Sequence, residues 1–258
     1  MARASRHYIP GFIWHITHRC HKREFLLRFR RDRHRWMQWL YQARKRYGIT
    51  ILNYIVTSNH IHLLVKDTGV KDSLPRAIQL VAGRTGQEYN NRKRRKGAFW
   101  EDRYHAVAIE SGDHLIRCLV YIDLNMVRAG AVRHPGEWES SGYNEIQRPR
   151  RKCVLISYEA LMNLTGYRNY DSFRKAHSRW VEAEVESYGV RRQPHWTESI
   201  AVGSKTFVEA VKERLSYRSL GRRKRQLSEG MELREPMVPY NELFEPENAD
   251  IGPKYRQF

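Results

Sequence analysis

The stretch SNHIHLLV, residues 58–65, places two histidines one residue apart in a segment that otherwise predicts a buried β-strand. Successive side chains of a strand point to opposite faces of a sheet. His60 and His62 therefore share one face, and the apolar residues of the stretch occupy the other. Two neighbouring imidazoles can hold a divalent metal ion, although a pair of half-exposed strand histidines without a ligand is the alternative interpretation.

The elements predicted around this stretch indicate an α+β fold. Strands are expected at residues 11–20, 49–58, 60–67 and 98–110, and helices at residues 32–47, 73–91 and 113–129. The order β-α-β-β-α-β-α is typical of a ferredoxin-like antiparallel sheet with helices on one face. The other face of such a sheet is free to carry a site.

The charge balance of the chain points to a polyanionic partner. Lysine and arginine number 47 against 28 acidic residues, which gives a net charge of +19 and a pI near 10.1. Nucleic acid is the commonest polyanion that such a surface binds. The three cysteines form no C-x-x-C pair, which argues against a disulfide framework or a four-cysteine zinc site. No apolar run is long enough to span a membrane, so we expect a cytoplasmic, nucleoid-associated protein without a membrane partner.

Composition changes at IQRPRRK, residues 146–152, which we interpret as a linker. We predict a catalytic domain at residues 1–146, a small α-helical C-terminal region at residues 147–229 and a disordered tail at residues 230–258. Arg191, Arg192 and the basic run at residues 218–225 would give the C-terminal region a second phosphate-contacting surface.

The predicted helix at residues 113–129 carries a polar stripe. Tyr121 and Asn125 are four residues apart and therefore lie on one face of the helix. Arg117 and Arg128 extend this stripe by one turn in each direction. The stripe is suited to face a ligand. The ordinary alternative interpretation is that Tyr121 is a half-buried structural tyrosine whose hydroxyl is hydrogen-bonded.

Four segments, in order, resemble the REP-associated tyrosine transposases, a branch of the single-tyrosine HUH, IS200-like transposases. They are PGFIWHITHRC at residues 10–20, NHIHLLV at residues 59–65, GAFWEDRYHA at residues 97–106 and YIDLNMVRAG at residues 121–130. The resemblance covers about residues 8–143, including the closing WESSGY. Met126 stands where the family usually has proline. This difference removes no functional group from the expected site.

The resemblance implies a role for each residue of the site. His60 and His62 correspond to the metal-binding pair, Asn125 completes the metal site, and Tyr121 is the nucleophile. The implied cofactor is Mg²⁺ or Mn²⁺, and the implied activity is cleavage and joining of single-stranded DNA through a 5′-phosphotyrosine intermediate beside a REP-type hairpin. The sequence leaves open a monomer, in which the site assembles within one chain, and a homodimer that exchanges the helix of Tyr121.

Further residues are candidates for DNA contacts because they combine charge or aromatic character with these motifs: Arg19, Arg103, Tyr104, Arg117 and Arg128. Zinc binding at HITHRCH, residues 15–21, is disfavoured because His15 and His18 are three residues apart and therefore face opposite sides of a strand. A catalytically inactive DNA- or RNA-binding protein of the same fold is the main alternative function. A plasmid-mobilising nuclease is less favoured because the sequence has no P-loop motif.

Overall fold

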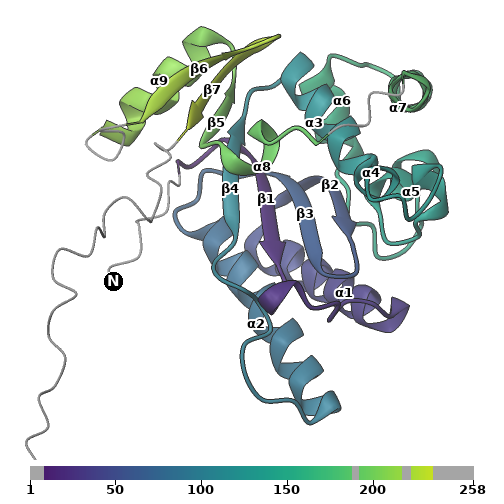
Figure 1. Ribbon diagram of the computed structural model, residues 1–258. Helices are drawn as coiled ribbons and strands as arrows, with labels where there is room; N and C mark the ends of the chain where they lie inside the picture. The colour runs from purple at the N-terminus through teal and green to yellow at the C-terminus, as the bar shows by residue number, and fades with distance from the viewer. Residues whose placement is uncertain (1–8, 188–191, 217–221, 235–258) are drawn as a thin grey trace, which may run out of the picture.

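The computed structural model describes residues 9–187, 192–216 and 222–234. The strands in these ranges form one sheet in the order β2-β3-β1-β4-β5-β7-β6. They are β1 (Ile13–Arg19), β2 (Thr50–Val56), β3 (His60–Lys66), β4 (His105–Ile109), β5 (Ala201–Gly203), β6 (Arg223–Leu227) and β7 (Gly230–Arg234). All neighbouring strands pair antiparallel except β4 and β5, which are parallel (Figure 1).

Helices connect and flank the strands. The α-helices are α1 (Arg30–Tyr47), α2 (Ser73–Lys93), α3 (Asp113–Asp123), α4 (Asn125–Arg128), α5 (Gly142–Gln147), α6 (Tyr158–Thr165), α7 (Tyr170–Glu186), α8 (His195–Glu198) and α9 (Lys205–Leu215). Two short 3-10 helices are η1 (His21–Arg23) and η2 (Pro135–Glu137). The predicted α+β class and antiparallel sheet are confirmed. None of the helices within the described ranges is both long and apolar enough to cross a lipid bilayer.

The histidine pair lies on a hairpin at the centre of the site. Strands β2 and β3 are joined by residues 57–59, and the Thr57 N–H donates to the His60 carbonyl at 2.9 Å to close the turn. Strand β1 pairs with β3 so that Thr17 lies opposite His62 and Arg19 lies opposite His60. This register brings the PGFIWHITHRC segment beside the histidine pair.

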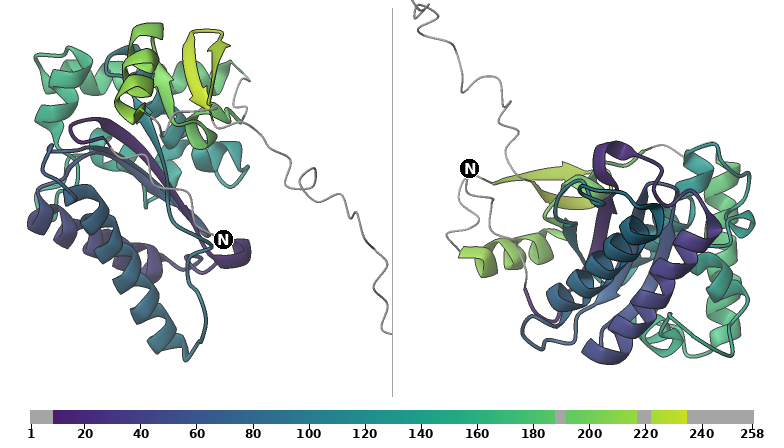
Figure 2. Two further views of the ribbon diagram at one scale, coloured as in Figure 1. Left: turned by 90° about the vertical axis from the view of Figure 1, so that its left-hand side faces the viewer. Right: turned by 90° about the horizontal axis from the view of Figure 1, so that it is seen from below.

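Helices α1 and α2 pack against each other on one face of the sheet (Figure 2). Their buried residues follow the helical spacing of one apolar face, with Trp36, Leu40 and Ala43 on α1. Gly48 ends α1 in the left-handed conformation at φ 67°, which glycine adopts without a Cβ clash. Helix α1 begins two residues before the predicted start at residue 32, so Asp32 lies in its first turn, where it pairs with Arg92 of α2.

The prediction that helices cover only one face is wrong. Helix α3 contacts β2, and α8 contacts β1 and β4, on the face that carries His62. The physical reason is that this face also carries apolar surface that must be buried, and Trp196 of α8, which is 2% exposed, covers it. Helices α3 and α8 thus lie over the face of the sheet that carries His62 (Figure 1).

The C-terminal region is also not purely helical, because β5, β6 and β7 extend the sheet beyond β4. The sequence of β6, RKRQL, lies at the sheet edge with four exposed residues, so it shows no apolar alternation. Strand β7 lies within the segment predicted as a disordered tail, and its Leu233 is fully buried. The remainder of that tail, residues 235–258, lies outside the described ranges, and the boundary at residue 146 stays a prediction.

Candidate functional site

Three predicted metal ligands come together from two elements. His62 lies inside β3 and is 3% exposed, whereas His60 begins that strand and is partly buried. The two imidazole centroids are 5.1 Å apart. Asn125 places its Nδ2 2.9 Å from Nε2 of His62, and a hydrogen bond also joins Asn125 to His60. The structure therefore brings the predicted triad into one cluster.

The helix that carries the polar stripe is interrupted where it meets the site. Helix α3 ends at Asp123 and α4 begins at Asn125, whereas the sequence predicts one continuous helix. Leu124 between them has φ −80° and ψ 4°, but its N–H still bonds to the Val120 carbonyl at 3.0 Å. The helical hydrogen bonds thus continue through the interruption, and Tyr121 and Asn125 keep the expected common face.

Burial disfavours the protonated form of three histidines on this face, His15, His60 and His62. Burial lowers the pKa of His60 to about 4, and the positive charges of Arg19 and Arg128 lower it in addition. Burial also holds the pKa of His62 well below its usual value and lowers the pKa of His15 to about 3. A neutral imidazole carries a lone pair on one nitrogen, which is the form that binds a metal ion.

Tyr121 lies beside this cluster. Its ring centroid is 6.1 Å from that of His62, in an edge-on orientation, and the residue is 7% exposed. The guanidinium carbon of Arg128 lies 3.9 Å from the centroid of the Tyr121 ring, and Arg128 also donates to the Tyr121 carbonyl. Burial raises the pKa of the Tyr121 phenol, and the charge of Arg128 acts in the opposite direction.

A cavity of 560 Å³ opens next to Tyr121. Its lining includes the predicted DNA-contacting residues Arg117 and Arg128, together with Trp196 of α8. Arg117 forms an ion pair with Glu229, which also lines the cavity. Tyr121 itself lines the cavity, so a ligand held there would contact this residue.

The remaining predicted DNA-contacting residues lie outside this cavity. Arg19 ends β1 opposite His60 and lies 4.0 Å from the carboxylate of Glu101. Arg103 is exposed in the segment before β4. Tyr104 packs edge-on against His18, with ring centroids 6.4 Å apart. These three residues thus do not line the cavity that Arg117 and Arg128 line.

The disfavoured zinc site is not formed. His15 contacts His62, whereas His18 stacks on Trp100 at 4.1 Å between centroids, on the opposite face of β1. Across the described ranges, no group of three or more His, Cys, Asp and Glu side chains is placed to hold a metal ion. Within the described ranges, His60, His62 and the amide of Asn125 are the candidate ligands that the structure brings together on this face.

Sequence reasoning missed a buried polar network behind Tyr121. Asp123, within the motif YIDLN, is fully buried and accepts a hydrogen bond from Asn53 of β2 at 2.9 Å. Its other oxygen lies 2.8 Å from Nε2 of His177 on α7, which is also fully buried. The network fixes α3 between β2 and α7. The available signal in the sequence was the charged Asp123 among apolar helix positions. Its partners His177 and Asn53 are 54 and 70 positions away along the chain, so no local pattern indicates them.

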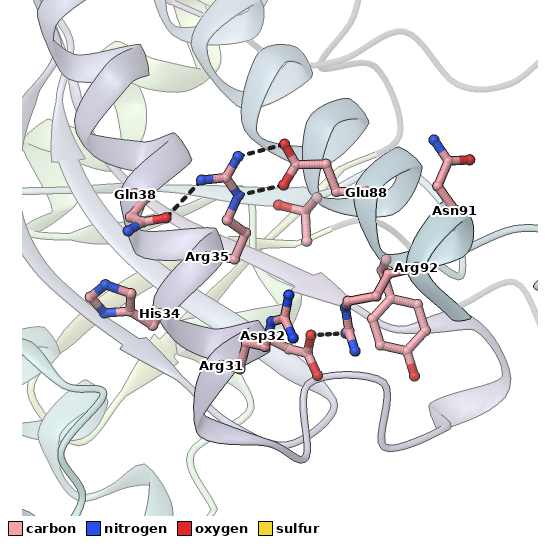
Figure 3. A pocket seen from close by; sticks show the side chains of 10 residues that line it. Arg31, Asp32, His34, Arg35, Gln38, Glu88, Asn91 and Arg92 are labelled. Carbon is pink, nitrogen blue, oxygen red and sulfur yellow. Dashed lines mark hydrogen bonds and ion pairs between the residues drawn. The ribbon is translucent and has the colours of Figure 1, made fainter. Parts of the chain in front are cut away.

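A second hollow, of 690 Å³, lies between α1 and α2 (Figure 3). Two of its guanidinium groups face carboxylates: Arg35 bonds to Glu88 at 2.7 Å, and Arg92 pairs with Asp32. None of the predicted site residues lines this hollow, and we assign no function to it.

The comparison with family models agrees with the motifs. Residues 9–125 match the family model described as IS200-like transposase. A structure of a REP-associated tyrosine transposase bound to a REP hairpin has 18% identity and a TM-score of 0.48, and the match covers 61% of this chain and 92% of that one. A candidate transposase from Deinococcus radiodurans R1 has 15% identity and a TM-score of 0.32, with coverage of 40% and 82%. Comparison with curated proteins finds no match.

Proposed function

We propose that this chain, whose residues 9–125 match the model of the IS200-like transposases, is a metal-dependent endonuclease and strand transferase that acts on single-stranded DNA. The observation that carries the proposal is the position of the Tyr121 ring, 6.1 Å from the ring of His62 and beside the cluster of His60, His62 and Asn125. A nucleophile and a set of metal ligands in one enclosed site are what phosphoryl transfer by a tyrosine requires.

The proposed reaction begins with attack of the Tyr121 oxygen on the scissile phosphorus. A bond from the phenol oxygen to phosphorus forms and the bond to the 3′-oxygen breaks, so the products are a 5′-phosphotyrosine and a free 3′-hydroxyl. The net proton balance moves one proton from the phenol to the 3′-oxygen. Joining is the reverse attack by a 3′-hydroxyl, since the phosphodiester is conserved in the covalent link.

Arg128 supports the proposed nucleophile electrostatically. A free phenol has a pKa near 10, and burial raises the pKa of Tyr121 further. The guanidinium 3.9 Å from the ring centroid favours the negative charge that develops on the phenol oxygen during attack. Arg128 is thus proposed to assist attack as well as to contact DNA.

The residues present fit a divalent ion such as Mg²⁺ or Mn²⁺. His60 and His62 offer neutral imidazole nitrogens, and Asn125 can offer its amide oxygen, which leaves further positions for water and phosphate. A bound ion would polarise the scissile phosphate and offset its developing negative charge. Two imidazoles suit Mn²⁺ better than Mg²⁺, which prefers ligand sets made of oxygen.

Hairpin-forming DNA of the REP type is the proposed substrate. The net charge of +19 supports binding to a phosphate backbone, and Arg117 and Arg128 line the cavity through which a strand would reach Tyr121. Arg19, Arg103 and Tyr104 are proposed to contact the DNA outside this cavity. Function as a monomer or as a homodimer is consistent with the proposal, because the described chain contains the whole constellation.

A covalent-adduct assay tests the proposed function. The full chain is incubated with a single-stranded hairpin oligonucleotide and Mn²⁺, and a complex that survives denaturation is expected. Tyr121→Phe should remove the adduct but leave DNA affinity within a few-fold, whereas the control Tyr41→Phe, on α1, should keep both. Hairpin binding without any adduct in the unmodified chain would favour the inactive DNA-binding alternative. An adduct in Tyr121→Phe would mean that another tyrosine is the nucleophile.

A further inference from the structure

We infer that His15 is a positioning residue that determines which ring nitrogen of His62 is free to bind the metal ion. The inference rests on the proposed function, because it concerns the metal site of that proposal. It adds a role for a residue of β1 and for the backbone of α8, neither of which belongs to the predicted triad.

The inference starts from a chain of buried hydrogen bonds. Nδ1 of His15 lies 2.7 Å from the carbonyl oxygen of Trp196, and Nε2 of His15 lies 2.8 Å from Nδ1 of His62. His15 is fully buried, and its ring stacks on that of His62 with centroids 5.0 Å apart and an interplanar angle of 19°. Nε2 of His62 then lies 2.9 Å from the amide nitrogen of Asn125.

The order of donors and acceptors in this chain follows from its first member. A carbonyl oxygen can only accept, so Nδ1 of His15 must carry the hydrogen that binds Trp196. A neutral imidazole has a single N–H, so Nε2 of His15 accepts and Nδ1 of His62 donates. The lone pair of His62 is then on Nε2, the nitrogen that faces Asn125. This is the tautomer in which His62 can act as a metal ligand beside His60.

The alternative is that His15 only fills space in the core. Its two hydrogen bonds argue against this, because an apolar residue of similar size would leave the Trp196 carbonyl and Nδ1 of His62 without these partners. Partners of this kind on the second nitrogen of a ligand histidine typically change metal affinity by about 10- to 100-fold. Strand β1 also supplies a matched control, since His18 points to the opposite face and stacks on Trp100.

The test measures the tautomer directly in the full chain, without DNA. Long-range ¹H–¹⁵N NMR correlations report which nitrogen of His62 carries the proton. We expect the hydrogen on Nδ1 in the unmodified protein, and a population with the hydrogen on Nε2 in His15→Phe. Mn²⁺ affinity, measured from the electron paramagnetic resonance signal of free Mn²⁺, should weaken about 10- to 100-fold in His15→Phe but remain unchanged in His18→Phe.

The results separate this inference from the proposed function. An Nε2–H tautomer of His62 in the unmodified protein would overturn the inference, even if His15→Phe failed to fold. Unchanged Mn²⁺ affinity in a folded His15→Phe variant would also overturn it. In either case, an intact DNA adduct in the unmodified chain would leave the proposed function standing. Loss of the proposed function would instead appear as no adduct despite the expected tautomer.

Discussion

Replacing Arg128 by methionine removes the guanidinium that lies over the Tyr121 ring but keeps much of its apolar volume. The guanidinium carbon is 3.9 Å from the ring centroid. A desolvated cation over an aromatic face contributes about 0.5–2 kcal/mol. If the transition state keeps this contribution, its loss slows attack by about 2- to 30-fold at a fixed pH.

The pH dependence of the rate checks the same argument. Burial raises the pKa of the Tyr121 phenol, and the positive charge of Arg128 lowers it. The phenolate is therefore a minor species between pH 7 and pH 9, and the cleavage rate should rise about tenfold per pH unit in this range. Arg128→Met removes a charge that favours the phenolate. The pH–rate profile of this variant should therefore run parallel to that of the unmodified chain, at lower rates.

Single-turnover adduct formation at saturating hairpin DNA and Mn²⁺, quenched and resolved on denaturing gels, measures both effects. Arg128→Lys keeps a charge but loses the planar group, so an intermediate rate is expected. Arg76→Met, an exposed position on α2, is the matched control and should react at the unmodified rate. Equal rates for Arg128→Met and the unmodified chain at every pH would refute an electrostatic role for Arg128.

The remaining predictions concern the metal ligands and the C-terminal region. His60→Ala or His62→Ala should abolish adduct formation at ordinary Mn²⁺ concentrations. EDTA should do the same to the unmodified chain. Adduct formation by Asn125→Ala should be partly rescued by excess metal, because an amide is a weak neutral ligand. Equal loss without rescue in all three would contradict the assigned roles. Trp196→Ala should lower the free energy of unfolding by about 3–5 kcal/mol and the melting temperature by about 6–20 °C, because the side chain is 2% exposed. A change in melting temperature below about 2 °C, measured by circular dichroism, would show that this burial contributes little to stability. A chain ending at Gln147 should bind hairpin DNA with a salt slope shallower by roughly 0.7–0.9 per lost phosphate contact, and an unchanged slope over four salt concentrations would exclude DNA contacts by the C-terminal region.

The sequence alone predicts that a chain ending near Gln147 keeps its chemistry, and the structure changes this expectation. Trp196 packs 6.2 Å from the Tyr121 ring, and its carbonyl accepts from His15. Removing α8 would expose the side chains of Tyr121 and His15 to water. Adduct formation by the truncated chain at saturating DNA should therefore fall together with its stability.

Local spacing explains which parts of the site were predictable. The pair His60 and His62 follows from strand alternation, and the pair Tyr121 and Asn125 follows from the helical repeat, because each relation spans at most four residues. The contact of His15 with Trp196 joins positions 181 residues apart, and no local pattern encodes it. Arg191 and residues 218–221 of the predicted DNA-binding surface lie outside the described ranges, so that surface stays a prediction.

The parallel pairing of β4 with β5 has a consequence for protein synthesis. Ala201 pairs with Ala108 and Val202 with Ile109, so about 90 residues must be translated after β4 before its partner exists. At roughly 5–20 residues per second this takes about 5–20 s, during which the outer edge of β4 is unpaired. Trp196 is made in the same late segment, just before β5. A ribosome-bound chain thus carries the histidine pair and Tyr121 long before the helix that encloses them, and a message cut short before codon 196 yields protein that bears every motif of the site without completing it.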